Sequence, residues 1–373
     1  MIALIFFQQH NLSEEWFDNN FNTVSDTLGP RYNRDFNVET EAGKLLDIFL
    51  LTENGIASLN ETKNNWIDSL QVYSENCFDS SILLAIKSKW EDIVDYSLNT
   101  NIDTWRESIS SVQEFIIPLI VKALDEINKS DVSKTDEKIR NQKINNLYSL
   151  KSFAEQNLFE FEGQLITNQV LCLCGEAGSG KTQLMAHTVN SLLRNKSAAV
   201  LCTGGSYLES RKIEEQIMSY LGLDYSFEDF VCVLEGLDVL NNSYSYIFID
   251  AINESTNIEV WKNGLVSITN AISRFKHIKF VFSLRSGYEN LILCDNIKTK
   301  IDNNEICQII HRGFETNATD AIKQFFNYYN IPFQSSDFLR SELTNPLFLK
   351  LYCENKPEKN CDIFTLLRLS RKN

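Results

Sequence analysis

The feature that most constrains this chain is the octapeptide GEAGSGKT at residues 175–182. It fits the pattern G-x-x-x-x-G-K-[ST], with the apolar run VLCLC before it and the helix-forming stretch TQLMAHTVNSLLRN after it. A strand, a glycine-rich loop and a helix in this order are the context that a phosphate-binding loop requires. A chance glycine turn is the alternative, and the complete motif in this context disfavours it.

The residue types in this loop suit a nucleoside triphosphate and magnesium. Glycines let consecutive backbone N–H groups face the β-phosphate, and the dipole of the following helix adds to the attraction. The Lys181 ammonium can bridge the β- and γ-phosphates, and the Thr182 hydroxyl is placed to ligate Mg²⁺. The binding residues expected here are Gly175, Glu176, Ala177, Gly178, Ser179, Gly180, Lys181, Thr182 and Gln183.

Two acidic residues downstream complete the chemistry that hydrolysis needs. Asp250 ends the apolar run YSYIFIDA and is expected to hold the water shell of Mg²⁺, which makes Thr182 and Asp250 the predicted metal site. Glu254 is a candidate for orienting and polarising the attacking water. A structural interpretation remains open for both, because an acid at a strand end can cap a loop, and Asn253 and Glu254 can cap the next helix.

Arg285 ends the next apolar run, IKFVFSLR. An arginine at that strand tip can read the γ-phosphate through paired hydrogen bonds, or it can pair with Asp250 or Glu289 for structure alone. The catalytic candidates are thus Lys181, Asp250, Glu254 and Arg285. His187 and His311 are expected to be packing or surface residues.

Short apolar runs alternate with helical stretches from Val170 onward. The predicted strands are VLCLCG, AAVLCTG, YSYIFIDA, IKFVFSLR and ICQIIH, and the helices between them begin near Lys181, Arg211, Ser226 and Asn257. Continuous apolar strands separated by helices indicate a parallel sheet covered on both faces. We therefore predict an α/β fold, a phosphate-loop sheet of the ASCE type, with an all-helical domain before it and a small helical subdomain after it.

The predicted domain boundaries follow changes in pattern. Residues 1–150 carry helical apolar spacing and four of the five tryptophans, residues 151–315 form the nucleotide domain, and residues 316–373 form a small, lid-like helical subdomain. The polar stretch DVSKTDEKIRNQKINNLYSL is expected to be an exposed helix or a linker. In TLGPRYNRDFNVET we expect a loop with a packed tyrosine and solvated arginines; an arginine that reaches the nucleotide or a neighbouring subunit is the alternative.

Composition narrows the possible partners. The net charge of −15 disfavours a broadly basic nucleic-acid surface, although it does not exclude a local one. Nine scattered cysteines, among them a C-x-C pair without a neighbouring histidine, indicate buried thiols in a reducing compartment. The start MIALIFFQQH is too short for a signal peptide or a membrane span and predicts a buried first helix or strand. We expect a cytoplasmic protein that does not enter the membrane.

The segments GEAGSGKT, FIDAINES, VFSLRSGYE and LTNPLFLKLY, in this order, resemble STAND-class NTPases of the NACHT-related group. More narrowly, they resemble the bacterial ATPases of AVAST-type antiviral defence, and LGPRYNRDFNVE is similar to a segment that precedes the ATPase in many of them. The resemblance implies an ATP-driven switch that oligomerises when a sensor region meets a foreign trigger. It further implies that Asp250 and Glu254 are the extended Walker B acids, that Arg285 is sensor 1, and that Pro346 lies against the nucleotide base.

Three functions are compatible with these motifs to different degrees. The first is a slowly hydrolysing ATP switch in bacterial defence that forms homo-oligomers. Because the chain stops soon after NPLFLKLYCEN and shows no effector signature, either it is a truncated piece or it relies on a separate sensor or effector protein. The second is a motor or chaperone-like AAA+ ATPase acting on protein or DNA, which would need an arginine such as Arg31 or Arg312 in a neighbour's site. The third, a binding module without hydrolysis, is disfavoured by the intact Lys181, Thr182, Asp250 and Glu254.

Overall fold

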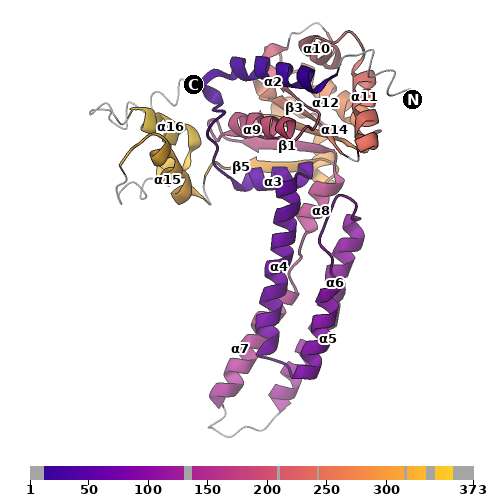
Figure 1. Ribbon diagram of the computed structural model, residues 1–373, viewed down its shortest axis with the longest axis vertical. Coiled ribbons are helices and arrows are strands. Elements are labelled where there is room, and N and C mark those ends of the chain that lie inside the picture. Colours follow the sequence, from indigo (N-terminus) through magenta and orange to yellow (C-terminus); the bar gives the residue numbers. More distant parts are fainter. Residues whose placement is uncertain are drawn as a thin grey trace. The chain divides into compact units, whose positions relative to one another are not determined.

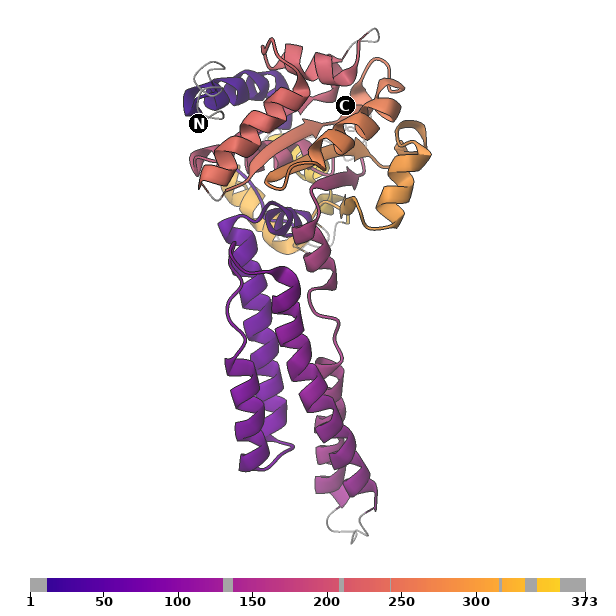
Figure 2. The same cartoon turned by 90° about the vertical axis from the view of Figure 1, so that its right-hand side faces the viewer.

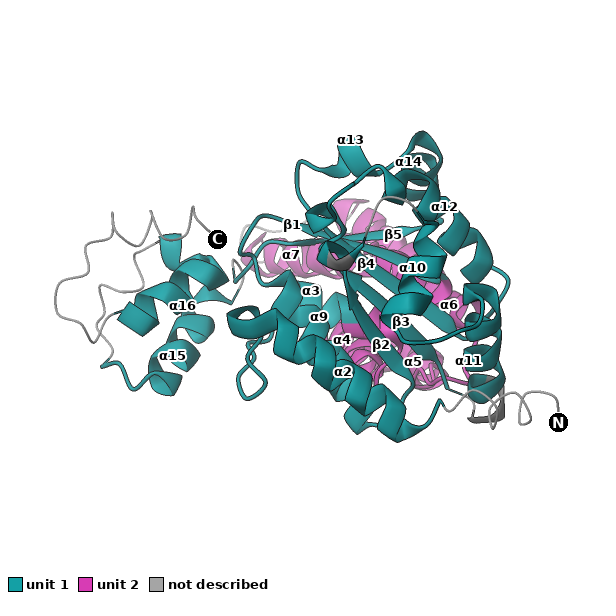
Figure 3. Cartoon of the chain, turned by 90° about the horizontal axis from the view of Figure 1, so that it is seen from above, with its two compact units in different colours: residues 1–46, 168–373 teal, residues 47–167 magenta. Residues whose placement is uncertain are grey.

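The computed structural model describes residues 12–129, 137–207, 211–241, 243–314, 317–332 and 341–355. The predictions for MIALIFFQQH at the start and for the basic RLSRKN at the end lie outside these residues. The chain divides into two compact units (Figure 3): unit 1 comprises residues 1–46 and 168–373, and unit 2 comprises residues 47–167. None of the helices among the described residues is long and apolar enough to cross a membrane.

Unit 1 is built on a five-stranded parallel sheet with the strand order β2-β3-β4-β1-β5 (Figure 1). The predicted strands and the parallel α/β fold are confirmed. The order puts β4 between the strand of the phosphate loop and the strand of Asp250, as an ASCE-type sheet requires. The strands are β1 (Val170–Gly175), β2 (Ala199–Thr203), β3 (Ser245–Asp250), β4 (Ile278–Arg285) and β5 (Cys307–His311).

Helices pack on both faces of this sheet because its central strands are apolar on both sides; all six residues of β1 and of β3 are buried. One face meets α9, and the other meets α11 and α12 (Figure 2). The helices of the sheet region are α9 (Lys181–Arg194), α10 (Ile213–Tyr220), α11 (Phe227–Asn241), α12 (Val260–Ile272), α13 (Glu289–Ile292) and α14 (Asp295–Asp302). The starts of α9, α10, α11 and α12 agree with the four predicted ones to within a few residues, whereas α13 and α14 were not predicted.

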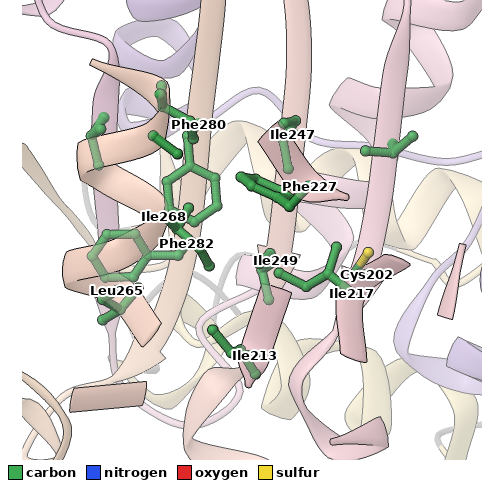
Figure 4. Packing of buried hydrophobic residues seen from close by; sticks show 14 of the residues in the cluster. Cys202, Ile213, Ile217, Phe227, Ile247, Ile249, Leu265, Ile268, Phe280 and Phe282 are labelled. Atoms are coloured by element: carbon green, nitrogen blue, oxygen red, sulfur yellow. The ribbon is translucent and has the colours of Figure 1, made fainter. Parts of the chain in front are cut away.

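A large apolar core fills the space between the sheet and α10 to α12. Alternate residues of the strands point into it, so the period of two along each strand selects the side chains that meet the helices. Figure 4 shows part of this cluster, which includes Cys202, Ile213, Ile217, Phe227, Ile247, Ile249, Leu265, Ile268, Phe280 and Phe282. This packing fixes the strand ends, where the candidate site lies.

The first part of the chain belongs to the sheet unit, in contrast to the predicted helical domain of residues 1–150. Helix α2 (Glu14–Leu28) packs on β2 and α9 through the side chains Phe17, Phe21, Val24 and Leu28. The 3-10 turn η1 (Gly29–Arg31) and an extended segment follow it, and α3 (Glu41–Leu50) contains the boundary between the units. The physical reason is that one amphipathic face can bury itself against a sheet as well as against other helices.

Unit 2 is entirely helical in its described residues. Its helices are α4 (Glu53–Glu75), α5 (Ser80–Glu91), α6 (Ile102–Lys129), α7 (Glu137–Ala154) and α8 (Glu160–Thr167). The expected apolar spacing is clearest in α6, where the buried residues recur at steps of three and four: Ile102, Trp105, Ile109, Val112, Ile116 and Ile120. Residues 137–150 of the polar stretch that was expected to be an exposed helix or a linker lie in α7, and residues 131–136 lie outside the described residues.

The end of the described chain forms a small helical group with its own core. It comprises α15 (Ala318–Tyr328), the 3-10 turn η5 (Ser341–Thr344) and α16 (Pro346–Asn355), which we call the lid helices. Phe325, Phe326, Phe348 and Leu349 are buried in its core, together with Val38 from the segment after η1. The lid helices are thus connected to the N-terminal part of unit 1 by apolar packing.

Candidate functional site

The predicted phosphate loop joins β1 to α9, as its sequence context requires. Gly178 and Gly180 have φ angles of +74° and +102°, a region that residues with a Cβ rarely adopt. At Gly175 a Cβ would lie 2.5 Å from the carbonyl oxygen of His311, so the close approach of β5 also demands glycine. These glycines allow the backbone to turn tightly at the N-terminus of a 14-residue helix, where an anion is favoured.

Lys181 lies against the loop that precedes it. Its Nζ donates to the carbonyl oxygens of Gly175 at 2.7 Å and Glu176 at 2.9 Å. Burial lowers the pKa of Lys181, and the nearby carboxylate of Asp250 opposes that shift. The ammonium is therefore held at the mouth of the loop by hydrogen bonds that phosphate oxygens can replace.

Asp250 is the centre of a chain of hydroxyl contacts at the carboxyl edge of the sheet. Thr182 Oγ1 donates to Asp250 Oδ2 at 2.7 Å, and Ser283 Oγ donates to Asp250 Oδ1 at 2.5 Å. The Ser283 hydroxyl also accepts from the backbone N–H of Ala251 at 2.8 Å. Asp250 is only 2% exposed, so these partners replace the water that its carboxylate loses on burial.

This oxygen-rich pair suits magnesium, which prefers oxygen ligands and keeps several of its waters. Thr182 would supply a direct hydroxyl ligand and Asp250 would hold the water shell, since the two oxygens already lie within hydrogen-bond distance of each other. Among the described residues no group of three or more His, Cys, Asp or Glu side chains could hold a metal ion. The Thr182–Asp250 pair is of the kind that binds magnesium together with a nucleotide.

Glu254 follows Asp250 in the 3-10 turn η3 (Ile252–Glu254) and is bound by an arginine. Arg31 Nη1 donates to Glu254 Oε2 at 2.9 Å and to Oε1 at 3.2 Å. The arginines after Gly29-Pro30 are exposed to solvent, as expected, and in addition they bind partners. Arg34 is engaged too, because its Nη2 donates to Asn22 at 2.8 Å and to Ser25 at 3.1 Å. Sequence spacing gives no signal for a pair 223 residues apart.

The packed tyrosine of the same segment is confirmed. Tyr32 is 9% exposed and meets the ring of Phe21 edge-on, with 6.1 Å between the ring centroids. Gln183, which was predicted to belong to the nucleotide-binding loop, binds the chain that follows Tyr32. Its side chain accepts from Asn33 N at 2.7 Å and donates to the carbonyl oxygens of Asn33 at 2.9 Å and Phe36 at 3.0 Å. The segment after η1 is thereby fastened to the helix of the phosphate loop.

Arg285 ends β4, which lies between β1 and β3. Its backbone N–H donates to Asn253 Oδ1 at 2.9 Å, while its side chain is largely exposed. Its positive charge is one of the influences that lower the pKa of Lys181, so the two cations lie near each other. A role of Arg285 as γ-phosphate sensor stays a prediction.

The lid helices meet the phosphate loop directly. The backbone N–H of Leu347 donates to the Gly178 carbonyl oxygen at 3.2 Å. Pro346 lies beside Gly180 and Gly313, since a Cβ on either glycine would be 3.5 Å or less from a ring carbon of Pro346. The position of Pro346 against the nucleotide base stays a prediction.

His311 is the residue of this region that sequence reasoning undervalued. It is buried at the end of β5, in register with Gly175, and its Nδ1 accepts from the Gly313 N–H at 3.1 Å. Burial, followed by the charge of Lys181, lowers the pKa of His311 to about 4. The neutral ring therefore carries its proton on Nε2, close to Gly180. A signal existed, because His311 ends a strand at the edge where ligands gather.

No family model matches the chain, and no curated protein matches it. Among solved structures, the chain is similar to AMPPCP-bound DnaA from Aquifex aeolicus, with 12% sequence identity, a TM-score of 0.36, and coverage of 66% of this chain and 68% of that one. It is also similar to Drosophila ORC bound to GC-rich DNA and Cdc6, with 12% identity, a TM-score of 0.27, and coverage of 55% and 70%. The phosphate-loop fold itself rests on the sheet order and the site geometry described above.

Proposed function

We propose that this protein is an ATP-binding, slowly hydrolysing switch of the STAND class that acts in bacterial antiviral defence and oligomerises in its ATP state. The defence role and the separate sensor or effector partner rest on the resemblance of the four motif segments to STAND-class NTPases. The more general proposal, a site for a nucleotide with Mg²⁺, is supported by one observation in the site.

That observation is the contact between Thr182 and Asp250 beside Lys181 at the carboxyl ends of β1 and β3. It brings the phosphate-binding cation, the metal-binding hydroxyl and the buried metal-binding acid together from separate parts of the sequence. Apolar side chains in the positions of Asp250 and Lys181 would cost less to bury, so the presence of these charged groups beside the loop favours a functional role. A triphosphate with Mg²⁺ uses all three groups at once.

The lid contact favours a switch over steady turnover. Leu347 binds the carbonyl of Gly178 within the loop that would hold the phosphates. A phosphate that reshapes this loop therefore changes the surface on which α16 rests, so nucleotide state and lid position are linked. A motor acting on protein or DNA shares the nucleotide site, and only turnover measurements separate the two functions.

The nucleotide assignment is tested by titrating ATP and Mg²⁺ into purified protein and into Lys181→Ala, with Lys122→Ala as control. Lys122 is 76% exposed on α6 of unit 2, and its substitution makes the same change in charge. We expect Lys181→Ala to lose ATP binding and Lys122→Ala to bind like the wild type. Equal ATP affinity in all three proteins would contradict the nucleotide site.

The switch is tested by turnover and native mass. We expect slow ATP hydrolysis that Glu254→Gln slows further without loss of ATP binding, and higher oligomers only with ATP and Mg²⁺. Fast multiple turnover that DNA or an unfolded protein stimulates would support the motor instead. Wild-type turnover in Glu254→Gln would remove Glu254 from the reaction.

A further inference from the structure

The pairing of Arg31 with Glu254 is exposed, so the fold does not depend on it. The two side chains are 46% and 48% exposed, and an ion pair of this kind contributes little to stability. Its effect is on position, because one guanidinium nitrogen binds both oxygens of the carboxylate. Those are the oxygens with which a catalytic glutamate would accept a proton from water.

The held carboxylate lines a cavity at the end of β2. Glu254 and Arg31 line a cavity of about 580 Å³ that is formed by one face of α2, the chain after β2 and the end of α10. The sheet order places β2 on one side of β3 and the phosphate-loop strand β1 on the other. The described cavity lining includes neither Asp250 nor any phosphate-loop residue: Trp16, Asn19, Asn20, Thr23, Val24, Thr27, Arg31, Thr203, Gly205, Tyr220, Leu221, Gly222 and Glu254.

The segment that carries Arg31 is also bound by the lid helices. The ammonium of Lys350 on α16 donates to the carbonyl oxygen of Pro30, the residue directly before Arg31. Asn33 donates to the hydroxyl of Tyr328 on α15 at 3.1 Å. The ring of Phe36 stacks on Tyr328 with 4.6 Å between centroids. Residues 30–36 therefore connect the lid helices on one side to Glu254 on the other.

We propose that Arg31 is a positioning residue that holds Glu254 away from the attacking water, and that the lid helices control this hold through residues 30–36. The inference rests on the proposed ATPase function. A lid that shifts when the loop binds ATP would pull on Pro30 and Asn33 and release the carboxylate. Arg31 thus couples the conformation of the lid to the rate of hydrolysis.

The test compares steady-state ATP hydrolysis by the full chain and by Arg31→Ala. We expect kcat to rise about twofold to fivefold, which corresponds to roughly 0.4 to 1 kcal/mol for an exposed ion pair, with KM and the Kd for ATP unchanged. The matched control is Arg274→Ala, which removes an exposed arginine that pairs with Glu228 at 2.9 Å outside residues 30–36, and it should leave kcat unchanged. Arg31→Lys keeps a cation beside Glu254 and should stay within twofold of the wild type.

Two further variants separate positioning from a merely structural role. In the Glu254→Gln background, Arg31→Ala should no longer raise kcat, because the residue being held has lost its function. Lys350→Met weakens the lid contact at Pro30 without touching the ion pair, so the lid pulls less on residues 30–36 and kcat should fall.

The outcomes distinguish this inference from the proposed function. A wild-type protein that binds no ATP refutes the nucleotide function itself. Normal ATP binding together with an unchanged or lowered kcat in Arg31→Ala refutes only the role of Arg31. An equal rise in the Glu254→Gln background also overturns it, since the effect would then bypass Glu254.

Discussion

Gly178 gives the sharpest quantitative test of how the lid helices meet the phosphate loop. Its φ is +74°, and a Cβ there would lie 2.8 Å from Leu347 Cβ and 2.9 Å from Leu347 Cδ2. Gly287 is a natural control, because its φ is +91° and a Cβ there meets nothing within 4 Å. Gly178→Ala thus combines backbone strain with overlap, whereas Gly287→Ala introduces backbone strain alone.

The expected losses of unfolding free energy follow from these two contributions. An alanine in the left-handed region costs about 1 to 2 kcal/mol, which is the expected loss for Gly287→Ala. Overpacking adds about 1 to 3 kcal/mol at Gly178, so Gly178→Ala should lose roughly 2 to 5 kcal/mol. The overlap involves a Cβ, which cannot move without its helix, so the strain can instead be relieved by moving α16 off the loop.

Two measurements on the nucleotide-free protein record both responses. Chemical denaturation followed by circular dichroism gives the free energies of unfolding, and hydrogen exchange of the α16 amides reports whether that helix leaves the loop. Leu347→Gly removes both overlapping carbons. It should therefore lower the free energy of unfolding less in the Gly178→Ala variant than in the wild type. Equal losses for the two glycine variants, with unchanged exchange in α16, would refute the contact.

Two further results are expected in the same region. Ser283→Ala removes the hydroxyl that donates to Asp250 Oδ1 and accepts from the Ala251 N–H. The affinity for ATP in the presence of Mg²⁺ should therefore fall about tenfold, whereas the affinity without Mg²⁺ should stay the same. Calorimetry with and without Mg²⁺ measures both affinities. His311 has a pKa of about 4 when folded and near 6.5 when unfolded, so its stabilisation is complete above pH 6.5 and is lost as the pH falls toward 4. That loss is of the order of 3 kcal/mol, and His311→Gln should show a correspondingly flatter fall in unfolding free energy over this pH range.

The sheet and the phosphate loop could be predicted because their determinants are local. Each strand is a short apolar run, and the loop motif is contiguous, so neither requires knowledge of distant residues. The position of Asp250 followed from the same logic, since a parallel sheet gathers the ends of its strands at one edge. The contact of Asp250 with Thr182 agrees with that prediction.

The pairings across the chain could not be predicted in this way. Arg31 and Glu254 meet because α2 docks on the sheet, and no periodic pattern in residues 14–28 says which partner its apolar face chooses. For the same reason, the sequence did not show that the first residues of the chain belong to unit 1 and not to a separate helical domain. His311 was undervalued because its burial depends on the register of β5 against β1, which a strand pattern alone does not specify.

The division of the chain has a consequence for how the protein forms during synthesis. Unit 2 occupies residues 47–167, within the polypeptide of unit 1, and many of its helix contacts join helices that follow one another in the sequence, as α5 and α6 or α6 and α7 do. Such local contacts form early, whereas the docking of α2 must wait for β2 and α9. At about 5 to 20 residues per second, the chain between Leu28 and Ala199 takes roughly 10 to 30 seconds to translate.

During that interval the apolar face of α2 has left the ribosome before its own binding surface exists. Phe17, Phe21, Val24 and Leu28 are then accessible to any other apolar surface, including a chaperone or the helices of unit 2. The equilibrium cost of closing so long a loop grows only with the logarithm of its length, so the folded protein is affected little. The inserted unit therefore leaves the N-terminal helix open to wrong contacts during biosynthesis, and Arg31 can reach Glu254 only after three of the five strands have been made.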